Sequence, residues 1–204
     1  MAQARTIVLW AQTAEVAVLA ATGVALYFAY RPDSAASWPD VSGPLSNDIT
    51  FGSVVRDVHG WAAWLALPTA VVAGVLLALR ARPPSHRAGG AGLATGVGLV
   101  LVVVAASVTG YLLPWDQLAL FAVTVGTNIS GYTWLRDGSV RFVLMDGTEI
   151  APATLFKWLL LHAVILGGAL AAFLVVARRR ARAGAGDAPP ERAGTPTVEV
   201  PAGD

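Results

Sequence analysis

Four long apolar segments constrain the fold of this 204-residue chain more than any other feature. A helix needs about 20 consecutive, mostly apolar residues to cross the hydrocarbon core of a bilayer. The segments cover about residues 7–30, 53–79, 91–113 and 154–177. Only 13% of the residues are charged, which is too few for an ordinary soluble domain. The sequence therefore predicts an all-α integral-membrane protein, a bundle of four transmembrane helices.

Arginines at the helix ends predict the orientation of this bundle. By the positive-inside rule, short connections rich in arginine stay in the cytoplasm. The arginines form two groups, between the second and third segments and after the fourth: Arg80, Arg82 and Arg87, then Arg178, Arg179, Arg180 and Arg182. We therefore expect a multi-pass protein of the cytoplasmic membrane with both termini in the cytoplasm. Because the net charge is only +1 and the basic residues flank helices, we expect no nucleic-acid binding.

Composition divides the chain into a membrane module and a tail. The first apolar segment is too long for a signal peptide and lacks a small-residue cleavage site, so we expect it to be retained. Residues 183–204 contain almost no large apolar side chain, which predicts a disordered cytoplasmic tail after a module of residues 1–182. Before the fourth segment, residues 118–123 predict a short surface helix and residues 131–147 predict turns with a hairpin.

The absence of cysteine limits the metal chemistry of the chain. It excludes a thiolate-ligated iron–sulfur cluster and a haem attached covalently through a C-x-x-C-H motif. Any metal would have to be bound by histidine or carboxylate side chains.

Two of the three histidines lie inside apolar segments at similar depth. His59 is near the outer start of the second segment and His162 is about two turns into the fourth, whereas His86 lies in a basic connection. Two bundle helices that each offer one imidazole at matching depth can hold a haem between them. The alternative is that each imidazole is only hydrogen-bonded to the backbone or to a neighbouring helix.

Glycines and cations near these histidines are compatible with a haem. Helices need faces without side chains where a flat porphyrin lies against them, and Gly23, Gly96 and Gly110 provide such faces. Ordinary close helix packing is the alternative explanation for these glycines. Arg56 and Lys157 lie on the outer side of the two histidines, where haem propionates would need cations. Snorkelling of both side chains to the membrane interface is the alternative explanation.

Four stretches resemble the N-terminal four-helix module of the cytochrome b family, which stands alone as the split cytochrome of plastid-type bf complexes. They are Thr22–Tyr30, Phe51–His59, Gly110–Gln117 followed by Thr124–Asn128, and Ala153–His162. The third contains the G-Y-x-L-P-W-x-Q element, which is specific to that family, and its Asp116 is similar to the bf branch. The resemblance covers about residues 15–177.

This resemblance implies a role for each matched residue. His59 and His162 match the two ligands of the family's outer-side, low-potential haem b. Arg56 matches a partner of the haem propionates, and Gly23 and Gly110 match the glycines beside that haem.

Other positions depart from the family pattern. Members of the family carry a second histidine about fourteen residues further along two helices, which holds an inner-side haem. In this chain Ala73 and Val176 occupy those positions. Leu9 occupies the position where the family has a glycine beside the inner haem. Leu166 occupies the position where the family has a proline after the first ligand of the fourth helix. Gly96 is kept, but glycine has no side chain that could bind iron. We therefore expect one bis-histidine haem b.

The resemblance implies electron transfer on the outer side of the membrane. We expect a mono-haem subunit of a multisubunit membrane oxidoreductase that exchanges electrons between a quinone or quinol pool and an outer-side partner. That partner would be an iron–sulfur protein, a c-type cytochrome or a molybdenum protein. The family's outer quinone pocket borders residues 114–127, so its candidate walls here are Pro114, Phe121, Ala122 and Val123. An amphipathic surface helix is the alternative for this region.

Two further functions remain open. A redox-inactive membrane anchor would be expected to have lost a ligand histidine, and a bf- or bc-type quinol oxidoreductase subunit would need inner ligands from other chains. Whether the chain is an enzyme by itself is undecided.

Glu15, about two turns inside the first helix, would cost about 2.5–3.5 kcal/mol if charged at the membrane centre. We therefore expect it to face the space of the missing inner haem or a partner subunit, and not lipid.

Overall fold

The computed structural model describes residues 2–42, 51–80, 86–128 and 152–186, and within these ranges the chain is almost entirely helical. The long helices are α1 (Ala2–Ala29), α3 (Phe51–Arg80) and α4 (His86–Leu112), and a fourth runs from α7 (Pro152–Leu160) through the π-helical turn η2 (Leu161–Leu166) into α8 (Gly167–Gly186). Two short helices are α2 (Ser37–Ser42) and α5 (Gln117–Asn128). The hairpin predicted for residues 131–147 lies outside the described residues.

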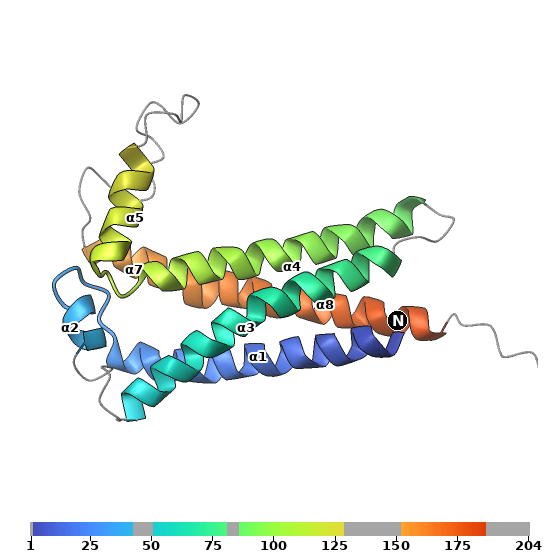
Figure 1. Cartoon of the computed structure of the whole chain (residues 1–204), viewed down its shortest axis with the longest axis horizontal. Coiled ribbons are helices and arrows are strands. Elements are labelled where there is room, and N and C mark those ends of the chain that lie inside the picture. The colour runs from blue at the N-terminus through green and yellow to red at the C-terminus, as the bar shows by residue number, and fades with distance from the viewer. Residues whose placement is uncertain (1, 43–50, 81–85, 129–151, 187–204) are drawn as a thin grey trace, which may run out of the picture.

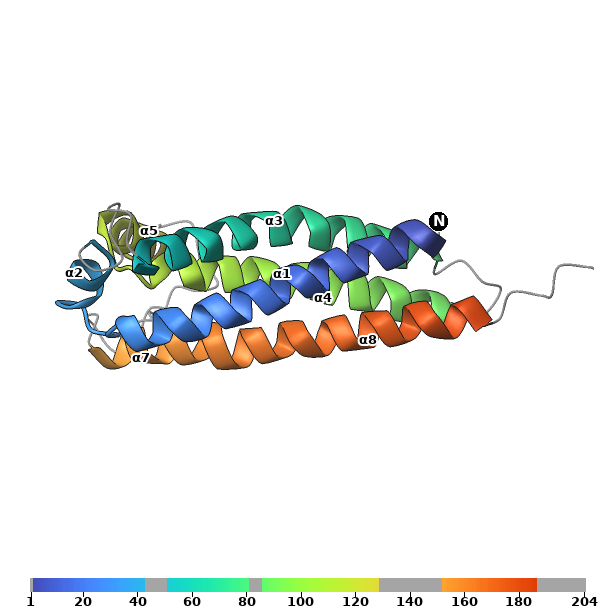
Figure 2. The same cartoon turned by 90° about the horizontal axis from the view of Figure 1, so that it is seen from below.

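The four long helices form one antiparallel bundle (Figures 1 and 2). Each of them is long and apolar enough to cross a membrane, which confirms the predicted fold class. Helix α1 packs between α3 and α8, and α4 also packs between α3 and α8. Hence α1 and α4 occupy one diagonal of the bundle, and α3 and α8 occupy the other. Helices α2 and α5 lie together at one end, here called the α5 end, and the N-terminus and the end of α8 lie at the terminal end.

The last helix continues beyond the apolar run that crosses the membrane. We predicted that this helix ends near residue 177 and that disorder begins at residue 183, but α8 continues to Gly186. Alanine and arginine are strong helix formers, so the helix outlasts the apolar run that crosses the membrane. The rest of the predicted tail, residues 187–204, lies outside the described residues.

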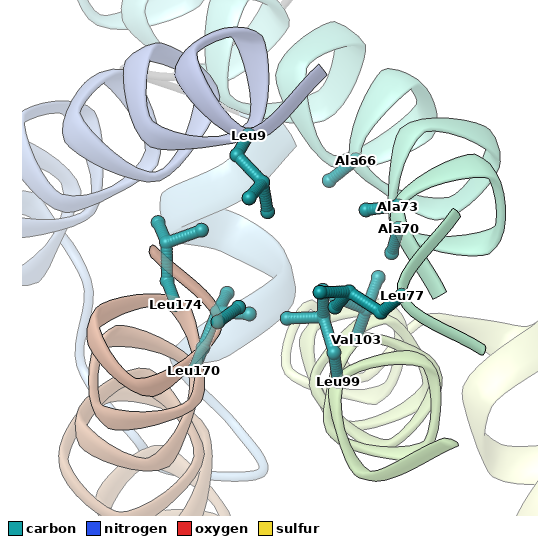
Figure 3. Close-up of a cluster of buried hydrophobic side chains, with 10 residues drawn as sticks. Leu9, Ala66, Ala70, Ala73, Leu77, Leu99, Val103, Leu170 and Leu174 are labelled. Carbon is teal, nitrogen blue, oxygen red and sulfur yellow. The ribbon is translucent and has the colours of Figure 1, made fainter. Parts of the chain in front are cut away.

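The terminal half of the bundle has a closely packed apolar core (Figure 3). It consists of ten buried residues from all four helices: Leu9, Ala66, Ala70, Ala73, Leu77, Leu99, Val103, Leu170, Leu174 and Ala177. The small alanine side chains of α3 allow its backbone to lie close to its neighbours. The approach is closest at Gly74 and Gly96, where a Cβ added to Gly96 would lie 2.8 Å from the carbonyl oxygen of Gly74.

The π-helical turn changes which residues of the last helix face the core. We placed the counterpart of the second inner ligand at Val176, but that side chain is 40% exposed, whereas Ala177 is fully buried opposite Ala73. The π-helical turn η2 explains the difference, because such a turn inserts an extra residue and shifts every later residue around the helix. The residue of this helix that faces the core in this region is therefore Ala177, fifteen residues after His162.

Polar contacts connect the helices at the α5 end. The hydroxyl of Tyr30, at the end of α1, donates to the carbonyl oxygen of Leu113 and lies 3.1 Å from Ser37 Oγ. Arg31 and Asp40 form an ion pair with a shortest N–O distance of 2.6 Å. Burial raises the pKa of Tyr30, and the hydrogen bonds from the Arg31 side chain lower the pKa of Asp40. These contacts hold α2 against the ends of α1 and α4.

Glu15 lies half-buried near the middle of the α1 span. Its Oε2 accepts a 2.6 Å hydrogen bond from Thr69 of α3, whose hydroxyl is also 2.9 Å from Oε1 of the fully buried Gln12. The carboxyl therefore contacts a polar group on a neighbouring helix within the bundle.

Replacing Gly96 by Ala should destabilise the bundle by about 1–3 kcal/mol, as overpacking of a tight core commonly does. The new Cβ would lie 2.8–2.9 Å from backbone atoms of Gly74, which cannot rotate away. Thermal unfolding in detergent measures the effect. Gly90→Ala on the same helix is the control, because nothing lies within 4 Å of its added Cβ. Equal stability of the two variants would contradict this packing.

Candidate metal centre

The bundle brings His59 and His162 together in the half nearer the α5 end. His59 projects from α3 and His162 from η2, so the imidazoles come from the two helices of one diagonal. Their ring centroids are 6.3 Å apart and the ring planes are inclined by 64°. His86 begins α4 at the opposite end of the bundle, and its side chain lies outside the described residues.

Hydrogen bonds to neighbouring helices define the tautomer of each histidine. His162 Nδ1 is 3.0 Å from the carbonyl oxygen of Ala106 and 3.1 Å from Thr109 Oγ1, both on α4. His59 Nδ1 is 2.8 Å from Thr22 Oγ1, and the His59 ring also has a backbone hydrogen bond to Leu19; both residues are on α1. A carbonyl oxygen only accepts, so Nδ1 carries the hydrogen and Nε2 keeps the lone pair. A neutral Nε2 of this kind is a metal ligand.

Gly23 and Gly110 make these hydrogen bonds possible. A Cβ added to Gly110 would lie 2.8 Å from His162 Cε1, and one added to Gly23 would lie 3.3 Å from His59 Cε1. Each glycine follows the accepting carbonyl by four residues, so its own N–H already bonds to that carbonyl within the helix. With no side chain at the glycine, the imidazole can reach the second lone pair of the same oxygen.

The spacing of the two imidazoles fits a metal between them. Bonds of about 2 Å from a metal to nitrogens on opposite sides place ring centroids roughly 6 Å apart, close to the 6.3 Å observed. Among the described residues, no group of three or more His, Cys, Asp or Glu side chains could hold a metal ion. Two nitrogens are too few for a bare ion, but they complete the shell of an iron that a porphyrin already binds.

The two predicted cations lie between the histidines and the α5 end. Arg56, one turn before His59, has Nη2 3.1 Å from Asp57 Oδ1 and Nη1 3.4 Å from the carbonyl oxygen of Val41 in α2. Lys157 is exposed on α7, about one turn before His162. Both side chains therefore lie on the same side of the histidine pair.

The candidate quinone residues lie on different faces of α5. Asp116 directly precedes this helix, and its carboxylate accepts a hydrogen bond from the Ala119 N–H. The helix is longer than the one predicted for residues 118–123. Val123 is buried against Leu155 and Trp158 of α7. Phe121 is 57% exposed, Ala122 is exposed, and Pro114 is half-buried in the turn before α5.

Sequence reasoning missed the threonines that contact the histidines. Thr22 and Thr109 each directly precede a glycine that we had singled out. The repeated Thr-Gly pair on α1 and α4, the two helices that carry neither His59 nor His162, was the available signal. It was not decisive, because a threonine inside a helix more often bonds only to its own backbone.

Comparison with known proteins relates this arrangement to one family. The sequence model described as cytochrome b/b6/petB matches residues 10–178. Cytochrome b6 of Prochlorococcus marinus (strain MIT 9215) is 30% identical over 158 residues, which cover 76% of this chain and 70% of that protein. Cytochrome b6 of Gracilaria tenuistipitata var. liui is also 30% identical over 158 residues, covering 76% of this chain and 71% of the relative.

A solved structure shares the fold. A chain of a hyperthermophilic respiratory Complex III superposes with a TM-score of 0.73 at 20% sequence identity. The alignment covers 98% of the present chain and 52% of the Complex III chain, so this chain spans about half the length of that neighbour. With the family match over most of its length, the chain belongs to the cytochrome b/b6 family.

Proposed function

We propose that this chain is a mono-haem b-type cytochrome subunit of a multisubunit membrane oxidoreductase. It transfers electrons between a quinone or quinol pool and a redox partner on the outer side of the membrane. The observation that carries this proposal is the facing pair His59 and His162, each fixed through Nδ1 so that Nε2 is available as a ligand. Membership of the cytochrome b/b6 family supports haem b as the group between them.

Each of the four helices contributes to this binding site. In the proposal, His59 of α3 and His162 of η2 would bind the haem iron, and groups on α1 and α4 hold these imidazoles in place. Gly23 and Gly110 keep two helix faces free of side chains beside the cofactor. Arg56 and Lys157 lie about one turn from the ligands toward the α5 end, where they can pair with propionates. When bound, haem b supplies reversible one-electron transfer.

The packed terminal half supports a single haem. Ala73 and Ala177 are fully buried where the second pair of ligands would be needed, and neither has an atom that can bind iron. Leu9 fills the same core, and Gly74 and Gly96 bring the backbones of α3 and α4 into contact. Binding a second haem would require separating these helices and losing their packing.

The position of the site supports exchange at the outer surface. By the positive-inside rule, the arginines of α8 belong in the cytoplasm, so the α5 end faces outward. His59 and His162 lie near that end, whereas the missing inner ligands would lie about 21 Å deeper. An iron–sulfur, c-type or molybdenum partner that docks at the α5 end would therefore be nearer the haem than any cytoplasmic protein.

Helix α5 is the proposed border of a quinone site. Its buried face rests on α7 through Val123, while Phe121 and other large apolar side chains remain exposed. A quinone ring could lie against the exposed face when a neighbouring subunit covers it.

Purified protein should show a low-spin b-type spectrum with one haem per chain, because only one facing histidine pair is present among the described residues. A pyridine haemochrome assay with protein quantification measures the ratio. His59→Ala or His162→Ala should abolish the low-spin spectrum, since either change removes an axial ligand. His86→Ala is the control and should leave it unchanged. Two haems per chain, or loss of haem in the control, would refute the assignment.

Gly110→Val should lower haem occupancy at least several-fold while leaving the helical content intact. Its Cβ would lie 2.8 Å from His162 Cε1 and would push the ring away from the Ala106 carbonyl. Gly168→Val, six residues after His162, is the control because nothing lies within 4 Å of its added Cβ. The haem-to-protein absorbance ratio and circular dichroism report the two properties. Equal occupancy in both variants would argue against a porphyrin beside Gly110.

In the intact complex, the nearest redox centre to this haem should lie beyond the α5 end, because the described core of the terminal half consists of aliphatic side chains that cannot bind a second haem. A structure of the purified complex measures the distances between centres. A nearest centre on the cytoplasmic side, with none on the outer side, would contradict the proposed direction of exchange even with the haem in place.

A further inference from the structure

Two threonines occupy equivalent positions beside the two histidines. On α1 the order is Leu19, then Thr22 three residues later and Gly23 after it, and on α4 it is Ala106, Thr109 and Gly110. In both triplets the imidazole forms hydrogen bonds to the backbone of the first residue and to the hydroxyl oxygen of the threonine. The glycine has no side chain, which leaves room for the ring. Thus the two helices without a ligand present the same three groups to the two that carry one.

The direction of each threonine hydroxyl is set by its own helix. Thr22 Oγ1 is 2.6 Å from the carbonyl oxygen of Val18, and Thr109 Oγ1 is 2.9 Å from that of Ala105, each four residues earlier. A hydroxyl has one hydrogen, and these carbonyls can only accept it. The threonine oxygen therefore turns a lone pair toward the imidazole, and each Nδ1–H lies between two acceptors.

Hydrogen bonds from Nδ1–H to two acceptors change the electron density at Nε2, the nitrogen that would bind the metal. Hydrogen bonds of this kind fix the plane of a metal-binding imidazole and raise its basicity, so Nε2 donates more electron density. Greater donation stabilises the more highly charged, oxidised iron and lowers the reduction potential. Because both axial positions have the same arrangement, their effects should be similar and should add.

We propose that Thr22 and Thr109 are a matched pair of positioning residues that hold the planes of His59 and His162 and lower the haem potential. This inference rests on the proposed bis-histidine haem. It goes beyond ligand identity, because it assigns a tuning role to residues that bind no iron themselves.

The chain contains a built-in control for these threonines. Thr95 on α4 also precedes a glycine, is buried, and donates its hydroxyl to the carbonyl four residues earlier, Ala91, at 2.8 Å. Gly96 beside it contacts Gly74 instead of an imidazole. Thr95→Val therefore removes a threonine hydroxyl that makes the same bond within its own helix, away from both histidines.

The experiment compares Thr22→Val, Thr109→Val, the double variant, the two Thr→Ser variants and Thr95→Val in the full-length haem protein. Redox titration gives the midpoint potential, electron paramagnetic resonance of the oxidised protein reports the relative planes of the axial rings, and a haemochrome assay gives occupancy. We expect each Val change at 22 or 109 to raise the potential, with additive shifts in the double variant and an altered resonance anisotropy. The Ser variants and Thr95→Val should match the native protein.

Each outcome decides the question. A Val variant that loses haem while its Ser counterpart keeps it also supports the role of the hydroxyl. Unshifted potentials in haem-loaded Val variants, equal effects of Val and Ser, or an equal shift in Thr95→Val would overturn the proposal. Absence of haem from the native chain would refute the proposed function itself, which is a different result from native haem with unshifted potentials.

Discussion

The rest of the structure depends on hydrogen bonds between each half-buried imidazole and the backbone of a neighbouring helix. A helical carbonyl already accepts one N–H and has a second lone pair, which a side chain four residues later usually shields. Gly23 and Gly110 remove that shield, so α1 holds His59 and α4 holds His162. These bonds link the ligand helices of one diagonal to the glycine helices of the other, and they leave each Nε2 available for a metal.

The two halves of the bundle differ because their glycines contact different groups: imidazole rings in one half and a neighbouring backbone in the other. Toward the α5 end, glycines make room for rings that come from neighbouring helices. In the terminal half, Gly74 and Gly96 face each other and bring two backbones into contact, and leucine and alanine fill the remaining space. A bundle of uniform apolar composition thus contains one region suited to a cofactor and one suited to close packing.

The α5 end of the bundle carries the two short helices α2 and α5 and the turn at Trp115. The contacts of Tyr30 with Leu113 and of Arg31 with Asp40 hold α2 near the ends of the long helices. Trp115, with a φ of 51°, adopts a left-handed backbone conformation that is uncommon for a bulky residue. Its ring packs against that of Trp158, with the ring centroids 5.9 Å apart. Figure 1 shows α5 leaving the bundle directly after this turn. The proposed outer-side partner would meet this surface.

The sequence by itself determined the helices that cross the membrane and the two histidines at matching depth, because both follow from local apolar composition and spacing along a regular helix. The sequence did not predict the π-helical turn, so the expected inner position fell on the half-exposed Val176 and not on the buried Ala177. Nor did it distinguish Thr22 and Thr109 from Thr95, since all three bond to their own helix in the same way. Only the tertiary structure decided which threonines meet an imidazole and which glycines meet another backbone, because those contacts depend on how four helices pack across two diagonals.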